Sequence, residues 1–509
     1  MLGYVYGTDQ GLNANQDLGL KVATPIGTLI GQLLFGRLAD VVGGRRMYGV
    51  ELIIIITATF SQALAGQGPA VNVIGVLVLW RFILGLGVGG DYPSSAVISS
   101  EFASTRIRGR MMTAVFAFQG WGNFFAAFVG FIIVASYKTT LLSDDPNHPN
   151  QLRSHVDTMW RLLIGLGCIP GVIALYFRLT IPETPRFTMD IEKNIHQVKP
   201  DSGDDGVVHR AHAPRATWAD FWAYFSKSKN FKVLLGTSYS WFALDVAFYG
   251  LNLNSSIIFQ AINFATPVSI SEGPRSMIPL DVYNDLYNIS VGNLILSAGG
   301  LIPGYWACFL FIESRGRKPI QYMGFIALTI LFVIMGFAYD KLTETTAMQK
   351  VFVLLYCFAN FFANFGPNTT TFIIPGEAFP TPYRSTAHGI SAASGKLGAI
   401  VAQVGFDKLK DIGGPPHGHA FVKHILKIFA LFMLTGIAST TLVPETMNKS
   451  LEELSNEKQD HFLQGEPVGH RTFLHLFHHI LAEQDALGSR PRDSSSNVVT
   501  QEQTLNSVH

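Results

Sequence analysis

The stretch VNVIGVLVLWRFILGLGVGGDYPSSAVIS, Val71 to Ser99, is apolar along almost its whole length and carries two charged side chains, Arg81 and Asp91. The hydrocarbon core of a bilayer is about 30 Å thick and a helix rises about 1.5 Å per residue, so about 20 such residues cross it. Glycines such as Gly85 and Gly89 weaken a helix in water but let helices pack closely in a membrane. The stretch therefore predicts a membrane-spanning helix.

Ten further apolar runs bring the expected number of spans to eleven. They are Val22–Ala39, Met47–Ala65, Met111–Ala135, Trp160–Phe177, Val233–Phe259, Asn288–Ile312, Ile320–Tyr339, Phe352–Ile374, Ala387–Phe406 and Ile425–Val443. Composition agrees, because the 509 residues are 48% hydrophobic and 14% charged, whereas a soluble domain carries about 25% charged residues. An all-α membrane protein is the predicted fold class, and eleven runs are too many for a soluble helical protein.

Charge and motifs exclude several classes of function. Lys plus Arg is 37 and Asp plus Glu is 36, giving a formal charge of +1, so nucleic acid is a disfavoured partner. The three cysteines lie far apart and no CxxC pair occurs, so no metal site is expected. The sequence lacks the HExxH and GxSxG patterns of enzymes and the GxxxxGK[ST] loop of ATP-driven transporters. We therefore expect no enzyme and no cofactor, with a proton gradient as the driving force.

Three sequence signals occur twice, about 270 residues apart, which indicates internal duplication. The pairs are GRLADVVGGRR (Gly36–Arg46) with ESRGRKP (Glu313–Pro319), Glu101 and Arg108 with Glu377 and Arg384, and PETPR (Pro182–Arg186) with PETMNK (Pro444–Lys449). The first signal follows one span in the first half and two in the second. The first half therefore has one span fewer before this signal than the second half. We expect a layout of twelve spans in two bundles of six, from which most of the first span is missing here. The N-terminal sequence MLGYVYG resembles the end of such a first span.

Basic residues cluster on alternate connections between spans, which predicts that these connections are cytoplasmic. The expected layout is an N-terminal bundle of five spans at 1–186, a central cytoplasmic loop at 187–232, a six-span bundle at 233–447 and a cytoplasmic, largely disordered tail at 448–509. A candidate surface helix lies in the central loop at about Trp218–Phe225.

The GRLAD loop, PETPR and the two-half layout resemble the major facilitator superfamily across nearly the whole chain. Denser runs narrow the resemblance: GVGGDYPSSAVISSEFA (Gly87–Ala103), WFALDVAFYGLNLN (Trp241–Asn254), GRKPIQ (Gly316–Gln321) and NFGPNTTTFIIPGEAFPTPYRSTAHGISAASGKLGA (Asn364–Ala399). Together they resemble the fungal high-affinity phosphate:proton symporters, with plant phosphate transporters next. This resemblance implies uptake of inorganic phosphate, and of arsenate as its analogue, across the plasma membrane by alternating access.

Charges inside the spans are the most informative residues, because each costs at least a few kcal/mol in a bilayer unless it is paired or hydrated. Asp91, Asp245 and Lys396 are such residues and together carry one negative charge when ionised. An anionic substrate adds to that charge, and protonating one carboxylate offsets it, which gives proton-coupled anion uptake a physical basis. The structural alternative is an Asp245–Lys396 ion pair that only holds the two halves together.

The resemblance also assigns individual positions. It implies that phosphate is coordinated at Tyr92, Gln119, Trp241, Asp245, Tyr249, Asn368 and Lys396, and that Asp91, with Asp245, takes part in proton movement. Independently, Trp241, Asp245 and Tyr249 recur every four residues and so share one helix face. Neutral donors such as Tyr, Gln and Trp suit an anion, because they bind oxygen without adding fixed charge.

A second charge group is expected to act in gating or in structure. The resemblance implies a cytoplasmic charge latch at Asp40, Arg45, Glu101 and Arg108, which Glu377 and Arg384 repeat in the second half. Gly44 stands where a basic residue is usual. Arg81 is expected to be structural, and His388 at the start of a span is expected to make a polar contact.

Two alternatives stay open. One is another proton-linked substrate of the same superfamily, such as a sugar or an organic ion. The other is a phosphate-binding receptor, or a truncated form that binds phosphate without transporting it.

Overall fold

The computed structural model describes residues 1–7, 12–42, 44–145, 148–180, 217–262, 278–413, 421–449, 451 and 454, without the side chains of 44–46 and 149. Residues Met1–Gln464 form one compact unit. The second unit, Gly465–His509, lies outside the described residues, as do most of the predicted central loop and tail. Among the described residues the protein is helical, and a single bridge between Gly68 and Val71 is the one extended pairing.

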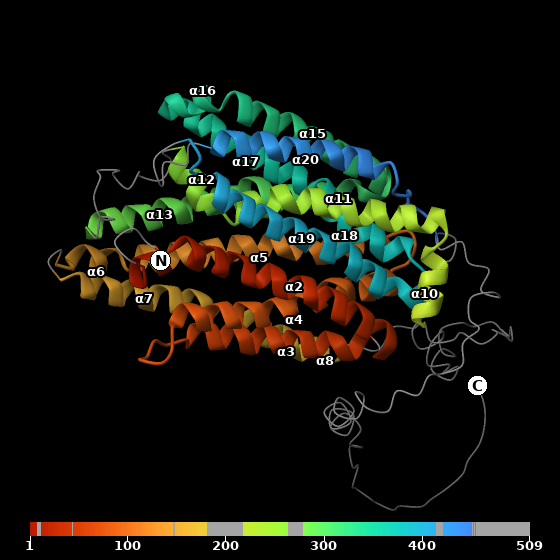
Figure 1. The fold of residues 1–509 in the computed structure, drawn as a ribbon, viewed down its shortest axis with the longest axis horizontal. Helices are drawn as coiled ribbons and strands as arrows, with labels where there is room; N and C mark the ends of the chain where they lie inside the picture. The colour runs from red at the N-terminus through yellow and green to blue at the C-terminus, as the bar shows by residue number, and fades with distance from the viewer. Residues whose placement is uncertain are drawn as a thin grey trace, which may run out of the picture. The chain divides into compact units, whose positions relative to one another are not determined.

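Within its described residues, the first half of the sequence forms helices α1 to α8 (Figure 1). They are α1 (Leu2–Val5), α2 (Ala14–Val42), α3 (Gly44–Ala63), α4 (Val73–Phe102), α5 (Arg108–Ser136), α6 (Lys138–Ser143), α7 (Pro149–Leu166) and α8 (Cys168–Thr180). The four-residue helix α1 is the part of the predicted first-span remnant that the structure places, and Tyr4 in it is buried.

The second half begins with α10 (Trp218–Phe225), which confirms the candidate surface helix. The remaining helices are α11 (Ser228–Asn252), α12 (Ser255–Ala261), α13 (Pro279–Leu296), α14 (Ile302–Arg315), α15 (Arg317–Phe337), α16 (Tyr339–Glu344), α17 (Thr346–Asn364), α18 (Pro367–Ala378), α19 (Arg384–Leu409) and α20 (Val422–Thr440). A π-helical turn at Ser297–Leu301 joins α13 to α14, and a 3₁₀ turn at Thr381–Tyr383 precedes α19.

Each predicted apolar run lies on one or two of these helices. In the described part of the chain, eight helical segments are long and apolar enough to cross a membrane, and nine if α11 and α12, which are bent by 60°, count as one. Helix α3 contains a shorter apolar segment, Met47–Ala63, and α19 coincides with the predicted run Ala387–Phe406. The helical membrane fold is thus confirmed, while the count of eleven spans stays a prediction.

The helices differ from the predicted runs at their ends and at their breaks. Run Trp160–Phe177 is part of a longer segment, because the more polar α7 continues it toward the N-terminus. Run Phe352–Ile374 breaks between α17 and α18, where Gly366 precedes Pro367. Proline lacks an amide hydrogen and restricts the preceding residue, so a helix breaks there without a loss of apolar character. A hydropathy profile shows neither the extension of a span into a more polar helix nor a helix break inside an apolar run.

Glycine allows α2 and α4 to pack almost backbone against backbone. A Cβ atom on Gly85 would lie 2.3 Å from the carbonyl oxygen of Thr24, and one on Gly89 would lie 2.4 Å from that of Thr28. On α2, Gly27 and Gly31 face α4 in the same way. Small residues give such contacts because membrane helices associate through close packing and not through the hydrophobic effect.

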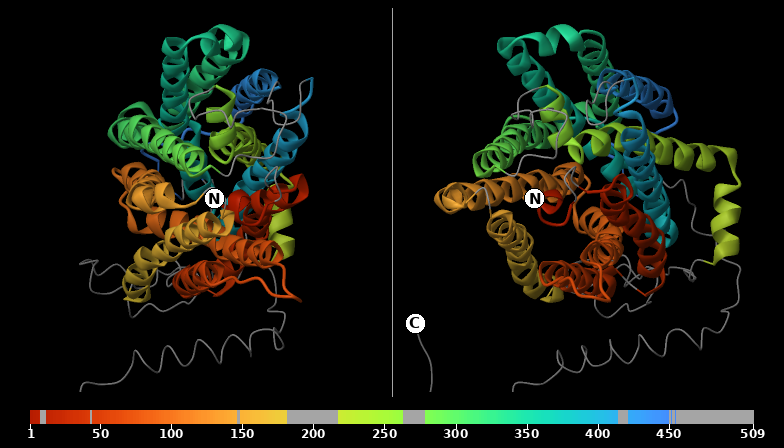
Figure 2. Two further views of the ribbon diagram at one scale, coloured as in Figure 1. Left: turned by 90° about the vertical axis from the view of Figure 1, so that its left-hand side faces the viewer. Right: turned by 60° about the vertical axis from the view of Figure 1, so that its left-hand side comes forward.

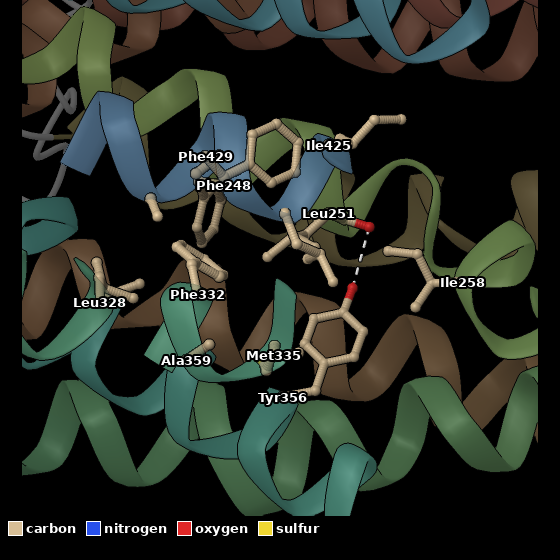
Figure 3. Close-up of a cluster of buried hydrophobic side chains, with 14 of the residues drawn as sticks. Phe248, Leu251, Ile258, Leu328, Phe332, Met335, Tyr356, Ala359, Ile425 and Phe429 are labelled. Atoms are coloured by element: carbon tan, nitrogen blue, oxygen red, sulfur yellow. Dashed lines mark hydrogen bonds between the residues drawn. The ribbon is translucent and has the colours of Figure 1, made fainter. Parts of the chain in front are cut away.

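The second half has its own apolar core between α11, α15, α17 and α20 (Figure 3). Phe332 and Phe429 pack edge to face with ring centroids 6.1 Å apart, beside Phe248. Tyr356 is fully buried, and its hydroxyl donates to the carbonyl oxygen of Leu251 at 3.0 Å.

The two halves of the sequence meet mainly along α2 with α19 and along α5 with α13 and α14 (Figure 2). Gly36 on α2 and Gly389 on α19 face one another, and a Cβ on Gly389 would lie 2.3 Å from the carbonyl oxygen of Gln32. Helix α19 therefore lies against the first half as well as against α11.

Replacing Gly89 by alanine should destabilise the protein, because its Cβ meets backbone that cannot move aside. We expect a loss of about 1–3 kcal/mol, the usual cost of overpacking, seen as a lower melting temperature of detergent-purified protein. Gly75→Ala on the same helix is the matched control, because nothing lies within 4 Å of its added Cβ. Equal melting temperatures for the two variants would contradict the packing argument.

Candidate functional site

Lys396 on α19 lies at the centre of a buried polar cluster. Its Nζ is 2.9 Å from Oδ2 of Asp245 and 2.9 Å from the hydroxyl of Tyr249, both on α11. Lys396 is 3% exposed and Asp245 is 1% exposed. From the first half, the ring of Tyr92 on α4 approaches the ammonium, with its centroid 5.0 Å from Nζ. A buried ion pair is thus flanked by aromatic faces, which attract a cation.

Local sequence explains why α11 and α19 come so close. Trp241 and Asp245 occupy one face of α11, and Gly395 lies opposite both. A Cβ on Gly395 would lie 2.5 Å from Cδ1 of Trp241 and 2.9 Å from Oδ2 of Asp245, and Gly398 faces the backbone of Phe242. The SGKLG sequence around Lys396 therefore sets the distance at which the ion pair forms.

A second polar cluster joins the two halves. The hydroxyl of Tyr305 on α14 donates to Oε1 of Gln119 on α5 at 2.6 Å. The amide of Asn368 on α18 donates to the Tyr305 oxygen at 2.9 Å and to Oδ1 of Asn364 at 2.7 Å. Gly120 leaves room for the Tyr305 ring, since a Cβ there would lie 2.7 Å from it.

Aromatic rings connect the two polar clusters. Tyr92 and Trp241 have centroids 6.2 Å apart, Phe116 stacks on Phe372 at 4.4 Å, and Phe116 meets Tyr305 edge to face at 5.9 Å. All seven positions predicted for phosphate thus gather around one aromatic cluster. Those beside Lys396 are Tyr92, Trp241, Asp245 and Tyr249, and those beside Tyr305 are Gln119 and Asn368.

Tyr305 and Asn364 belong to this arrangement but were not among the predicted site residues. Tyr305 is 1% exposed, and a tyrosine inside an apolar run is more often part of the packing, so its type alone gave no signal. The asparagines did carry one, because Asn360, Asn364 and Asn368 recur every four residues inside an apolar run, although the structure places Asn368 on α18, after the break that follows α17.

Asp91 lies apart from the Lys396 cluster. Its Oδ1 is 2.6 Å from Nη1 of Arg178 on α8, and its side chain is 31% exposed. Glu51 on α3 is near it, is fully buried and accepts a hydrogen bond from the hydroxyl of Ser94 at 2.8 Å. Oε2 of Glu51 has no hydrogen-bond partner among the described residues. Asp91 therefore forms the ion pair with the guanidinium, and Glu51 lies near that pair.

The structure changes the charge balance expected from the sequence. Glu51, an acid inside the run GVELIIII, and Arg178 were both left out of the predicted sum. With them included, the Asp245–Lys396 pair is neutral and the extra negative charge lies at Asp91 and Glu51. The alternative that Asp245 and Lys396 hold the halves together is wrong, because α11 and α19 both belong to the second half.

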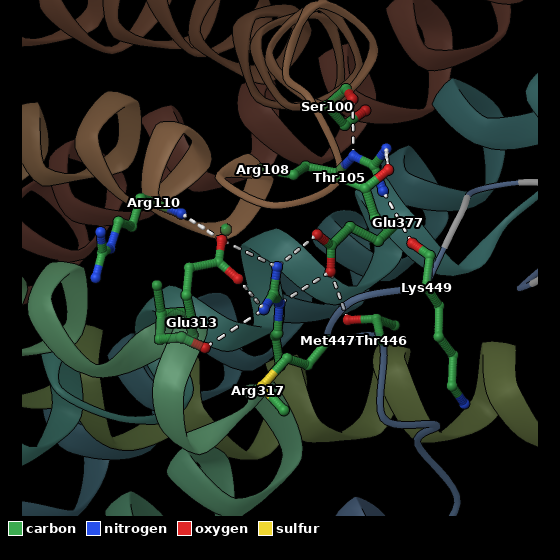
Figure 4. Close-up of polar contacts among 12 residues, drawn as sticks. Ser100, Thr105, Arg108, Arg110, Glu313, Arg317, Glu377, Thr446, Met447 and Lys449 are labelled. Carbon is green, nitrogen blue, oxygen red and sulfur yellow. Dashed lines mark hydrogen bonds and ion pairs between the residues drawn. The ribbon is translucent and has the colours of Figure 1, made fainter.

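A network of charges closes one end of the helices (Figure 4). Arg317 is 1% exposed and is 3.0 Å from Glu377 and 2.7 Å from Glu313. Thr446 also donates to Glu377, and Glu313 accepts the backbone amide of Arg110 from the first half at 3.1 Å. This end is therefore a buried, polar contact between the halves.

The duplicated Glu and Arg signals come together across the halves, although Glu377 forms its ion pair with Arg317 of its own half. Glu101 is 2.7 Å from Arg384, and Arg108 lies near Glu377 (Figure 4). Asp40 accepts the backbone amides of Ser385 at 3.0 Å and Thr386 at 2.7 Å. An acid at a helix N-terminus satisfies free amides and complements the helix dipole, so Asp40 of the first half caps α19 of the second.

The other predicted charges have different outcomes. The side chain of Arg45 lies outside the described residues. Arg81 donates to the carbonyl oxygen of Leu20 at 2.9 Å and so ties α4 to α2, which agrees with a structural role. His388 is fully buried, with Nε2 3.1 Å from the carbonyl oxygen of Phe372 and its ring edge-to-face with Trp241. This is the polar contact expected of it.

Comparison with known proteins identifies the family of the chain. Residues 9–457 match the family model described as "Sugar (and other) transporter". A repressible high-affinity phosphate permease of Neurospora crassa is 46% identical over 481 residues, which are 90% of this chain and 82% of that protein. An inorganic phosphate transporter of Saccharomyces cerevisiae is also 46% identical, over 489 residues, 90% of this chain and 80% of that protein.

Solved structures share the fold. The proton:xylose symporter XylE, of the major facilitator superfamily, matches with a TM-score of 0.62 at 20% identity, covering 89% of this chain and 92% of that one. The chain is therefore a multi-pass membrane protein with the fold of the xylose symporter, and it belongs to the sugar (and other) transporter family together with fungal phosphate permeases.

Proposed function

We propose that the protein takes up inorganic phosphate together with protons by alternating access, in the plasma membrane. The observation that carries the proposal is the buried Lys396–Asp245 pair with neutral donors from both halves around it. Relatives named as phosphate permeases and transporters support the choice of substrate.

The ion pair suggests how proton and anion are linked. While Asp245 is ionised, its carboxylate occupies the Lys396 ammonium at 2.9 Å. A proton transferred to Asp245 removes that negative charge and leaves the ammonium as a partner for a phosphate oxygen. Tyr92, Gln119, Trp241, Tyr249 and Asn368 then supply hydrogen bonds without fixed charge.

A second proton position is proposed at Asp91. When ionised, Asp91 and Glu51 together carry one more negative charge than Arg178 neutralises, so one proton can bind here without leaving the guanidinium unpaired. Asp91 precedes Tyr92 in the chain, so α4 carries a proposed proton position and a proposed phosphate position on adjacent residues, which face Arg178 and Lys396 respectively.

Contacts at both ends of α2 support alternating access. At one end Asp40 binds the start of α19. At the other end Lys21 donates to Asn254 at 3.0 Å, and Tyr4 of α1 donates to Asp285 at 2.9 Å. Lys21 and Asp40 are about 28 Å apart along the helix. We propose that these contacts open in turn, with the Glu101–Arg384 end as the cytoplasmic latch.

Asp245→Asn and Lys396→Ala should each lower uptake of labelled phosphate into proteoliposomes more than about tenfold, because each leaves one buried charge without its partner. The measurement uses an imposed inward proton gradient. The matched control is Asp340→Asn with Lys423→Ala, an Asp–Lys pair of similar length, 3.1 Å, that is solvent-exposed. Unchanged uptake in both site variants would remove these residues from the mechanism.

The same assay separates the alternative substrates. Unlabelled arsenate should compete with labelled phosphate, and glucose should not. Competition by glucose would favour a sugar transporter, while phosphate binding without flux would favour a receptor or non-transporting form.

Tyr305→Phe should raise the KM for phosphate about five- to tenfold with little change in maximal rate, because one neutral hydrogen bond is worth about 1–1.5 kcal/mol. Its hydroxyl orients both Gln119 and Asn368. Tyr356→Phe is the matched control, since it loses a buried hydroxyl bonded to Leu251 in the apolar core. A KM that changes equally in both variants would argue against a site role for Tyr305.

Glu101→Gln should disturb the latch, because it leaves the buried Arg384 without its ion-pair partner. Loss of one partner of a buried pair costs about 3–5 kcal/mol, expected here as a lower melting temperature and slower uptake. The charge-reversed double variant Glu101→Arg with Arg384→Glu should recover part of both. If the double variant is as impaired as the sum of its single variants, the pair is not a latch.

A further inference from the structure

Helix α10 is an apolar element that lies outside the candidate spans. It begins with a capping box in which Thr217 and Asp220 satisfy one another's backbone amides, and it has the sequence WADFWAYF. Two residues separate it from α11, whose axis it crosses steeply in Figures 1 and 2. The helix therefore lies across the end of a membrane-crossing segment.

One face of α10 packs on the protein. Phe221, Tyr224 and Phe225 are buried against Phe379 and Tyr383, with the ring centroids of Phe221 and Tyr383 5.9 Å apart. These partners immediately precede Arg384, the latch residue at the start of α19. The buried face thus anchors α10 to the second half.

The opposite face is apolar but exposed. Trp218 is 52% exposed and Trp222 is 66% exposed, and Ala219 and Ala223 lie with them on this face. The guanidinium of Arg37 on α2 lies 4.9 Å from the Trp218 ring centre, so the helix also reaches the first half. Tryptophan is the residue type that concentrates where hydrocarbon meets headgroups.

Among the described residues next to α10, basic side chains predominate. Lys229 and Lys232 are exposed on the first turns of α11. Asp220, the acid of α10, is occupied by the capping box. A basic rim beside an exposed tryptophan face matches a surface of anionic headgroups.

We propose that α10 binds the anionic surface of the membrane, with Trp218 and Trp222 inserted at the level of the headgroups and Lys229 and Lys232 facing acidic phospholipid. Helix α10 contacts the second half at Phe379 and Tyr383, next to Arg384, and the first half at Arg37. A membrane surface that binds α10 therefore also acts on the Glu101–Arg384 latch.

Lipid quenching of tryptophan fluorescence tests this directly and does not depend on transport. The full chain is reconstituted in nanodiscs of phosphatidylcholine brominated near the headgroup end of its chains, with or without phosphatidylserine. The fluorescence of Trp218 and Trp222 is obtained as the difference between the wild type and the Trp218→Phe, Trp222→Phe variant. We expect this component to be quenched, and about twofold more strongly with phosphatidylserine, with high salt removing the increase.

Two variants control the experiment. Lys229→Gln with Lys232→Gln should abolish the gain caused by phosphatidylserine and keep the basal quenching. Trp306→Phe reports on a tryptophan of α14 that is 46% exposed and lies within a candidate span, and its component should be quenched equally in both lipids. Elution as a single species confirms that each variant is folded, and the single Trp222→Phe variant replaces the double one if it does not.

The proposal is overturned if the fluorescence of Trp218 and Trp222 is quenched in neither kind of nanodisc, because the helix would then lie in water or against another protein. It is equally overturned if quenching is the same with and without phosphatidylserine, since the surface would then not select acidic lipid.

Discussion

The buried ion pair between Lys396 and Asp245 is the constraint on which the rest of the arrangement depends. A single charge held in the hydrocarbon region costs several kcal/mol, so each must be neutralised at every stage. The pair at 2.9 Å satisfies this in the described state. In the proposed mechanism an anion replaces the carboxylate only when that carboxylate is neutralised, and this condition would couple a proton to the anion without a long-range signal.

Helix α19 connects this pair to the latch. Its first turn is held by Asp40 and by the Glu101–Arg384 pair, both through the first half of the chain, and its middle carries Lys396. Glycines keep α19 close to α2 on one side and to α11 on the other. Because α19 is packed so closely on both sides, its first turn cannot shift without moving Lys396. Opening of the latch would therefore act directly on the Lys396–Asp245 pair.

Much of this was predictable, because long apolar runs and duplicated motifs report directly on helices and halves. The family resemblance assigned the site residues on α11, and their four-residue spacing placed them on one helix face. Asp245 and Lys396 also stood out by their charge in apolar runs. Tyr305 was not predictable, because its type does not separate a hydrogen-bond donor from a packed ring. The partner of Asp91 was also missed, since Arg178 stands at the end of its run, where a basic residue is ordinary, and the pairing needs α4 and α8 brought together.

The crossed pairing at the latch has an energetic consequence. Duplication gave each half a Glu and an Arg, yet Glu101 pairs with Arg384 of the other half, so neutrality of the buried network requires both halves. A buried ion pair gains from attraction but loses the hydration of both charges, and the two terms nearly cancel. When the halves separate, water hydrates the same side chains again. A latch built from such pairs can therefore be specific for one arrangement of the halves and still open at modest cost, as alternating access requires.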